Sequence, residues 1–119
     1  LNFGHTVGHA VEQVTGYDRY LHGEAVAMGM GVAARLSAAR GFCRAEDARR
    51  IEALLERLGL EHRVPSGLDV EALVRAVALD KKTERSTVAY VVCEGIGRCR
   101  AEPMDVREIA EVIVRGGTQ

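Results

Sequence analysis

The sequence predicts a mainly helical domain with one small β-ribbon, and three observations support this fold class. Most of the chain falls in segments whose apolar side chains recur every three to four positions, as in amphipathic helices. Residues 87–93 are instead rich in β-branched side chains, which is typical of a strand. The composition, with 47% apolar and 28% charged residues, is that of a globular protein rather than a disordered tail. At 119 residues the chain is expected to form a single domain, 1–119, with its own core.

The first two predicted helices differ in how apolar they are. Residues 5–14 read as a helix that ends at a C-capping Gly16. From 23 to 34 the only charged residue is Glu24, so this helix is expected to be buried on most faces. Its small residues, such as Gly29 and Gly31, would let neighbouring segments approach closely. Polar character returns over 35–40, before Gly41 ends the segment.

The remaining elements follow from their apolar spacing and their turn residues. Two further amphipathic helices are predicted, over 46–58 and from Val70 to about Asp80. A strand over 87–93, turn glycines at 94–97 and a short returning strand over 98–102 predict a hairpin. A closing helix begins after Asp105, its expected N-cap. The apolar positions behind these helices are Ile51, Leu54, Leu55 and Leu58; Val70, Leu73, Val74 and Val77; and Val106, Ile109, Ala110 and Ile113.

Charge, hydropathy and cysteine usage exclude several classes of function. A net charge of -1 argues against nucleic-acid binding, and no apolar run approaches the ~20 residues of a membrane span. Three cysteines without metal-type spacing indicate reduced thiols and a cytoplasmic protein, with Cys93 expected to be buried. The chain opens on Leu1 rather than Met, so we expect it to be a piece of a longer protein.

The histidines carry the strongest chemical signal. His5 and His9 are four residues apart and would project from one face of a helix, flanked by Gly4 and Gly8 at the same period. His22 stands at the entrance of the next helix. This pattern suits a metal or substrate site, although such a pair also occurs with no role beyond surface hydrogen bonds. The fourth histidine, His62, lies in a polar run and is expected to be a solvated loop residue.

Two strings and a later tripeptide carry a family resemblance. Leu-Asn-Phe-Gly-His-Thr-Val-Gly-His-Ala-Val-Glu (1–12), His-Gly-Glu-Ala-Val-Ala-Met-Gly-Met (22–30) and Asp-Lys-Lys (80–82) occur in the order typical of the 3-dehydroquinate synthase family. The resemblance covers essentially the whole chain. It extends only to the C-terminal helical domain of the family. The resemblance implies that the NAD-binding N-terminal domain is absent from this chain.

The resemblance also implies an activity with its cofactors and partners. The family enzyme uses NAD and Zn²⁺ (or Co²⁺) to convert 3-deoxy-D-arabino-heptulosonate 7-phosphate into 3-dehydroquinate and phosphate, in the shikimate pathway of aromatic amino acid biosynthesis. The implied partners are this small sugar-acid phosphate, the enzyme's own N-terminal domain and a second copy in a homodimer. Without that N-terminal domain the isolated chain is expected to be inactive.

Site residues are carried over by their place in the matched strings. His5 and His22 match the two zinc-ligating histidines, whereas the third ligand, a Glu, belongs to the missing half. His9 matches a histidine near the reacting hydroxyl and is the candidate for proton transfer. Asn2 matches a substrate-binding Asn. One lysine of the pair Lys81–Lys82 matches a lysine that contacts the anionic substrate; we favour Lys81 and retain Lys82 as the second candidate.

Simpler roles are open for several of these residues. Asn2 would also suit a helix cap, and the lysine pair would also compensate a helix dipole. Glu12 and Glu24 lie close to the histidines as additional candidate ligands, but Glu24 better fits a first-turn acid or a residue that orients a histidine.

Two other functions stand beside the synthase. Related sugar-phosphate cyclases that make inosose or valiolone skeletons share the histidine motif. A non-catalytic helical module that binds a metal or a partner protein is the third hypothesis, because the chain contains no dinucleotide-binding Gly-x-Gly-x-x-Gly string after a strand.

Overall fold

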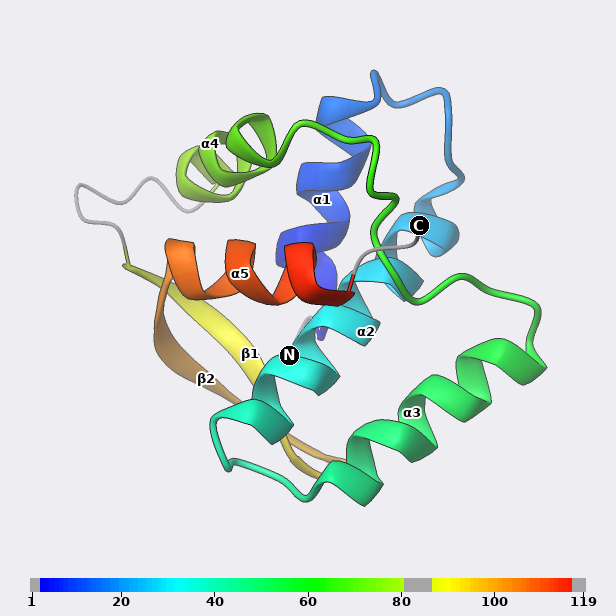
Figure 1. Ribbon diagram of the computed structural model, residues 1–119, viewed down its shortest axis with the longest axis vertical. Helices are drawn as coiled ribbons and strands as arrows, with labels where there is room; N and C mark the ends of the chain where they lie inside the picture. Colours follow the sequence, from blue (N-terminus) through cyan, green and yellow to red (C-terminus); the bar gives the residue numbers. More distant parts are fainter. Residues whose placement is uncertain (1–2, 81–86, 117–119) are drawn as a thin grey trace.

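The structure, a computed structural model, describes residues 3–80 and 87–116. Within them it confirms the predicted class, a mainly helical domain with one β-hairpin (Figure 1). The elements in chain order are α1 (His5–Val14), α2 (His22–Ala39), α3 (Ala45–Arg57), α4 (Val70–Asp80), β1 (Thr87–Gly95), β2 (Arg98–Asp105) and α5 (Val106–Gly116).

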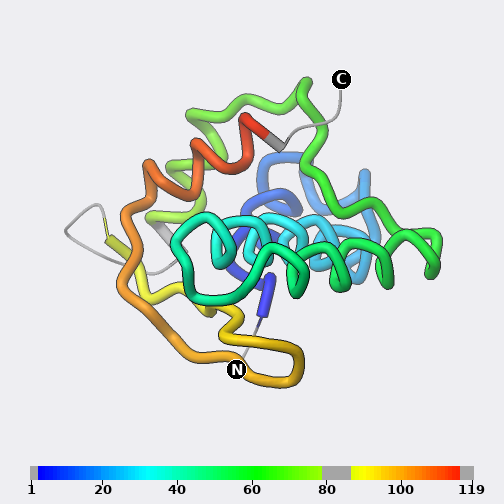
Figure 2. The backbone as a smooth tube through the Cα atoms, turned by 60° about the horizontal axis from the view of Figure 1, so that its bottom comes forward, coloured from blue at the N-terminus to red at the C-terminus, as the bar shows by residue number. Residues whose placement is uncertain are grey.

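Helix α2 is the centre of the domain. It contacts α1, α3, α5 and β1, and Figures 1 and 2 show α3 running along one side of it. Its apolar residues are buried around most of the helix, as the near-absence of charge predicted. The side chains packed in the core come from every element except α3, whose own buried residues lie outside this cluster; among the largest are Met28, Leu36, Leu73, Tyr90, Met104 and Ile109.

The hairpin matches its predicted turn but is longer than predicted. β1 and β2 pair antiparallel, and Gly95 faces Arg98 across the turn formed by Ile96 and Gly97. The second strand was expected to end at 102 but continues to Asp105. It passes through Pro103, which a two-stranded sheet tolerates because each strand is an edge and need not donate every backbone N–H. Asp105 then caps α5, accepting a 2.8 Å hydrogen bond from the backbone N–H of Arg107.

Glycine residues allow the backbones of α1 and α2 to come into direct contact. Gly4, the N-cap of α1, has φ +82°, a left-handed conformation that favours glycine. A Cβ built on Gly29 of α2 would lie only 1.9 Å from the carbonyl oxygen of Gly4. The first turn of α1 therefore rests directly on the backbone of α2. The close approach expected at Gly29 is confirmed, and it fixes where the histidines of α1 lie relative to α2.

Candidate functional site

Three histidines from two helices converge at one surface of the domain. The ring centroids of His5 and His9 on α1 lie 5.6 Å apart, and those of His5 and His22, the first residue of α2, lie 5.7 Å apart. The third side of this triangle, from His9 to His22, measures 6.0 Å. His5 is half-buried, whereas His9 and His22 are exposed, so the cluster opens to solvent.

Hydrogen bonds orient the imidazoles of His5 and His22. Nδ1 of His22 lies 3.0 Å from a carboxylate oxygen of Glu12, and Nδ1 of His5 lies 3.3 Å from the backbone carbonyl of Phe3. Both partners are acceptors, so each Nδ1 carries the proton and each Nε2 keeps the lone pair that a metal requires.

The two acidic residues near the histidines have separate roles in the fold. Glu24 is the first-turn acid that the sequence indicated, since its carboxylate accepts a 2.8 Å hydrogen bond from the backbone N–H of Leu21. Glu12, whose side chain is 14% exposed, pairs with His22. The residue that contacts a histidine is therefore Glu12 rather than Glu24.

The donor set fits a borderline-soft divalent metal. Imidazole nitrogen and carboxylate oxygen are ligands that zinc and cobalt accept. Two imidazoles on one zinc, each bound at ~2.0–2.1 Å, bring their ring centroids to roughly 5 Å, close to all three separations in the cluster. One ligand atom from each of His9, Glu12 and His22 also lies within 4.8 Å of the others. The geometry thus assembles the predicted pair His5 and His22 together with two further donors, and the choice of ligands stays a prediction.

The sequence also predicted residues that bind the substrate. Asn2, Lys81 and Lys82 lie outside the described residues.

His62 is buried, contrary to the expectation of a solvated loop residue. It is 5% exposed, its Nε2 lies 2.8 Å from a carboxylate oxygen of Glu56, and Arg35 donates both to its Nδ1 and to its carbonyl oxygen. Burial lowers the pKa of the Arg35 guanidinium, and the charge of Arg63 lowers it further, while Glu52 opposes both effects. His62 is therefore held in a buried position by Arg35 of α2, 27 positions earlier, and by Glu56 of α3.

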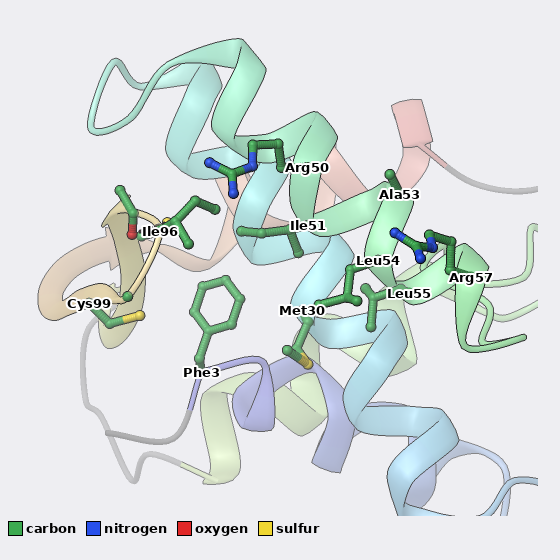
Figure 3. A pocket seen from close by; sticks show the side chains of 13 residues that line it. Phe3, Met30, Arg50, Ile51, Ala53, Leu54, Leu55, Arg57, Ile96 and Cys99 are labelled. Atoms are coloured by element: carbon green, nitrogen blue, oxygen red, sulfur yellow. Dashed lines mark hydrogen bonds between the residues drawn. The ribbon is translucent and has the colours of Figure 1, made fainter.

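An apolar pocket of about 500 Å³ lies between α3 and the hairpin (Figure 3). Its apolar lining includes Phe3, Met30, Ile51, Leu54, Leu55 and Ile96. The apolar stripe of α3 was its signal in the sequence, because Leu54 belongs to that stripe, is 56% exposed and lines the pocket. No histidine lines the pocket, so it is separate from the histidine cluster.

The three cysteines are free thiols, and Cys93 is buried as predicted. Burial and the neighbouring Cys93 raise the pKa of the Cys43 thiol to about 11, and burial likewise raises the pKa of Cys99. Raised values disfavour the thiolate that nucleophilic chemistry needs. Among the described residues, no helix is long and apolar enough to cross a membrane.

Comparison with known proteins identifies the family of this chain. Residues 1–83 match the family model described as 3-dehydroquinate synthase C-terminal. The 3-dehydroquinate synthase of Citrifermentans bemidjiense is 48% identical over 113 residues, which is 94% of this chain and 31% of the relative. That of Gloeobacter violaceus is 49% identical over 98 residues, or 82% of this chain and 27% of the relative.

Two solved structures share the fold. A 2-deoxy-scyllo-inosose synthase, complexed with carbaglucose-6-phosphate, NAD+ and Co2+, has a TM-score of 0.83 and 26% identity over 96% of this chain and 34% of its own. A 2-epi-5-epi-valiolone synthase from Streptomyces hygroscopicus subsp. jinggangensis, with NAD+ and Zn2+ bound, has a TM-score of 0.77 and 25% identity over 96% of this chain and 31% of its own.

The chain spans about a third of the length of these relatives. The family model covers most of the chain, and the histidine cluster lies within the matched residues. The chain belongs to the 3-dehydroquinate synthase family and corresponds to its C-terminal domain.

Proposed function

We propose that this chain is the helical C-terminal domain of a 3-dehydroquinate synthase, which converts 3-deoxy-D-arabino-heptulosonate 7-phosphate into 3-dehydroquinate and phosphate. The observation that carries the proposal is the convergence of His5, His9 and His22, from two helices, in a chain that is 48% identical to a protein of that name. The activity belongs to the complete protein, in which an NAD-binding N-terminal domain precedes this one.

The metal site is proposed at His5 and His22, with a third ligand, a Glu, from the part of the protein outside this chain. Two observations support it: Nδ1 of each ring faces a hydrogen-bond acceptor, which leaves Nε2 for a metal, and related cyclases have been solved with NAD+ and Co2+ or Zn2+. A bound divalent cation would supply Lewis-acid stabilisation of a developing alkoxide on the substrate.

The other residues hold substrate and move protons. His9, which lies next to both proposed ligands, is proposed to accept a proton from a substrate hydroxyl and to return it. An imidazole suits this exchange because one ring nitrogen can accept a proton and the other can donate one. Asn2 and Lys81, with Lys82 as the second candidate, would hold the anionic substrate by a hydrogen bond and a point charge.

The alternative function is that of another sugar-phosphate cyclase. It is favoured by the fold that this chain shares with the inosose and valiolone synthases. Sequence identity favours the first function over this alternative: the chain is 48% identical to the dehydroquinate synthase, but 26% and 25% identical to the inosose and valiolone synthases. A non-catalytic module explains the histidine cluster but not this identity. The implied homodimer and the cytoplasmic location stay predictions; the free thiols are consistent with a reducing compartment.

The deciding experiment is a turnover assay on the complete two-domain protein with NAD and Zn²⁺. The proposal expects 3-dehydroquinate and inorganic phosphate to form together from 3-deoxy-D-arabino-heptulosonate 7-phosphate. Turnover only with the substrates of the inosose or valiolone enzymes would move the protein to that group. Zinc binding without turnover of any of these substrates would favour the non-catalytic module.

A further inference from the structure

Glu12 lies where it can control the second of the two proposed metal-binding histidines. It follows His5 and His9 at seven and three positions along α1, so all three side chains share one face of that helix. Its side chain is 14% exposed, whereas the His22 side chain that it contacts is 59% exposed. A largely buried carboxylate thus holds an imidazole that is itself mostly exposed to solvent.

The contact selects one tautomer of His22. A carboxylate accepts hydrogen bonds and cannot donate them, so the 3.0 Å contact requires a proton on Nδ1 and leaves the lone pair of the neutral ring on Nε2. The backbone carbonyl of Phe3 imposes the same tautomer on His5. The two rings are therefore prepared alike, one by the backbone and one by the Glu12 side chain.

We propose that Glu12 is a positioning residue for the metal site: it holds His22 with Nδ1 protonated and Nε2 available to the metal. This inference rests on the metal site proposed above. Partners of this kind fix the ring and raise its basicity, and their loss typically weakens metal binding 10- to 100-fold. The competing role is that of a direct ligand, since an oxygen of Glu12 also lies within 4.8 Å of nitrogens of His9 and His22.

Two substitutions and a matched control separate these roles in the complete two-domain protein. Glu12→Ala removes the acceptor, whereas Glu12→Gln keeps an acceptor oxygen without the charge. Glu24→Gln removes a carboxylate at the start of the same helix as His22, but one that bonds the backbone N–H of Leu21. Zinc affinity is measured by competition with a chelator, and the coordination sphere by the visible absorption spectrum of the Co²⁺-loaded protein.

We expect Glu12→Ala to bind zinc 10- to 100-fold more weakly with an unaltered cobalt spectrum, Glu12→Gln to recover most of the loss, and Glu24→Gln to match the parent. Zinc affinity equal to the parent's in Glu12→Ala would overturn the proposal. A changed cobalt spectrum, with Glu12→Gln as weak as Glu12→Ala, would also overturn it and make Glu12 a ligand.

Nitrogen NMR of His22 in the metal-free protein tests the orienting contact separately from the metal. The parent should show a protonated Nδ1, and Glu12→Ala should shift the neutral ring toward the Nε2-protonated form. An unchanged tautomer in Glu12→Ala would refute the positioning role. If the tautomer shifts while His22→Ala binds zinc as tightly as the parent, the proposed metal site fails and the contact between Glu12 and His22 stands.

Discussion

A methyl group on Gly29 would act on the contact that places the histidines of α1. Its Cβ would lie 1.9 Å from the carbonyl oxygen of Gly4, where ordinary contacts begin at 3.4 Å. In Gly29→Ala the first turn of α1 must therefore retreat by about 1.5 Å. His5 follows Gly4 directly in the chain, so the retreat displaces a proposed metal ligand.

The expected cost has a structural and a functional part. Overpacking of this kind typically destabilises a protein by about 1–3 kcal/mol. A displacement of about 1 Å in an active site can lower the rate about 10²-fold. Gly29→Ala should therefore lower the urea midpoint of unfolding, the zinc affinity and, by about 10²-fold, the turnover of the complete protein.

Gly31→Ala is the matched control. A Cβ there would also lie 1.9 Å from a backbone oxygen, that of His62, which is not part of the histidine cluster. It should cost similar stability but leave zinc affinity and turnover of the folded protein close to the parent's. Parental stability and zinc affinity in Gly29→Ala, or an equal loss of turnover in both variants, would show that the contact between Gly4 and Gly29 does not position the histidines.

Four further outcomes are expected. His9→Ala should lower turnover about 10²–10⁴-fold while zinc content stays at the parent level by elemental analysis; loss of zinc would make His9 a ligand. The 119-residue chain alone, with NAD and zinc, should form no 3-dehydroquinate in the turnover assay; measurable product would contradict the need for a second domain. Because burial raises the pKa of Cys43 to about 11 from 9.0, its alkylation rate, followed by mass spectrometry, should rise several-fold between pH 10 and 11; a plateau from pH 10 upward would contradict this. His62→Ala should cost about 1–3 kcal/mol in urea unfolding, because Arg35 loses a buried acceptor; no cost would mean that water replaces it.

The helices and the hairpin could be predicted because their signals are local. Apolar periodicity depends only on neighbours three and four positions away. The N-cap at Asp105 is equally local, because its carboxylate accepts a hydrogen bond from the backbone N–H of Arg107, two positions later. Periodicity does not say what covers an apolar stripe. Leu54 was therefore assigned to the same face as the buried Leu55, although the structure leaves it 56% exposed beside an open pocket.

The candidate site was predictable only in part, for the same reason. The i, i+4 spacing places His5 and His9 on one face of α1, but nothing local says that the chain returns His22 to them. The resemblance to the family supplied that pairing. The contact between Glu12 and His22 depends on how α1 meets α2, and the burial of His62 depends on an arginine 27 positions earlier. Both are long-range contacts that spacing does not encode.

The proposed metal site is tested most directly by the anomalous difference map of the complete protein crystallised with Zn²⁺, recorded at the zinc edge. We expect one peak at the histidine cluster, ~2.0–2.1 Å from a ring nitrogen of His5 and of His22, with His9 outside the coordination sphere. A peak held by His9, Glu12 and His22, or no peak at the cluster, would contradict it.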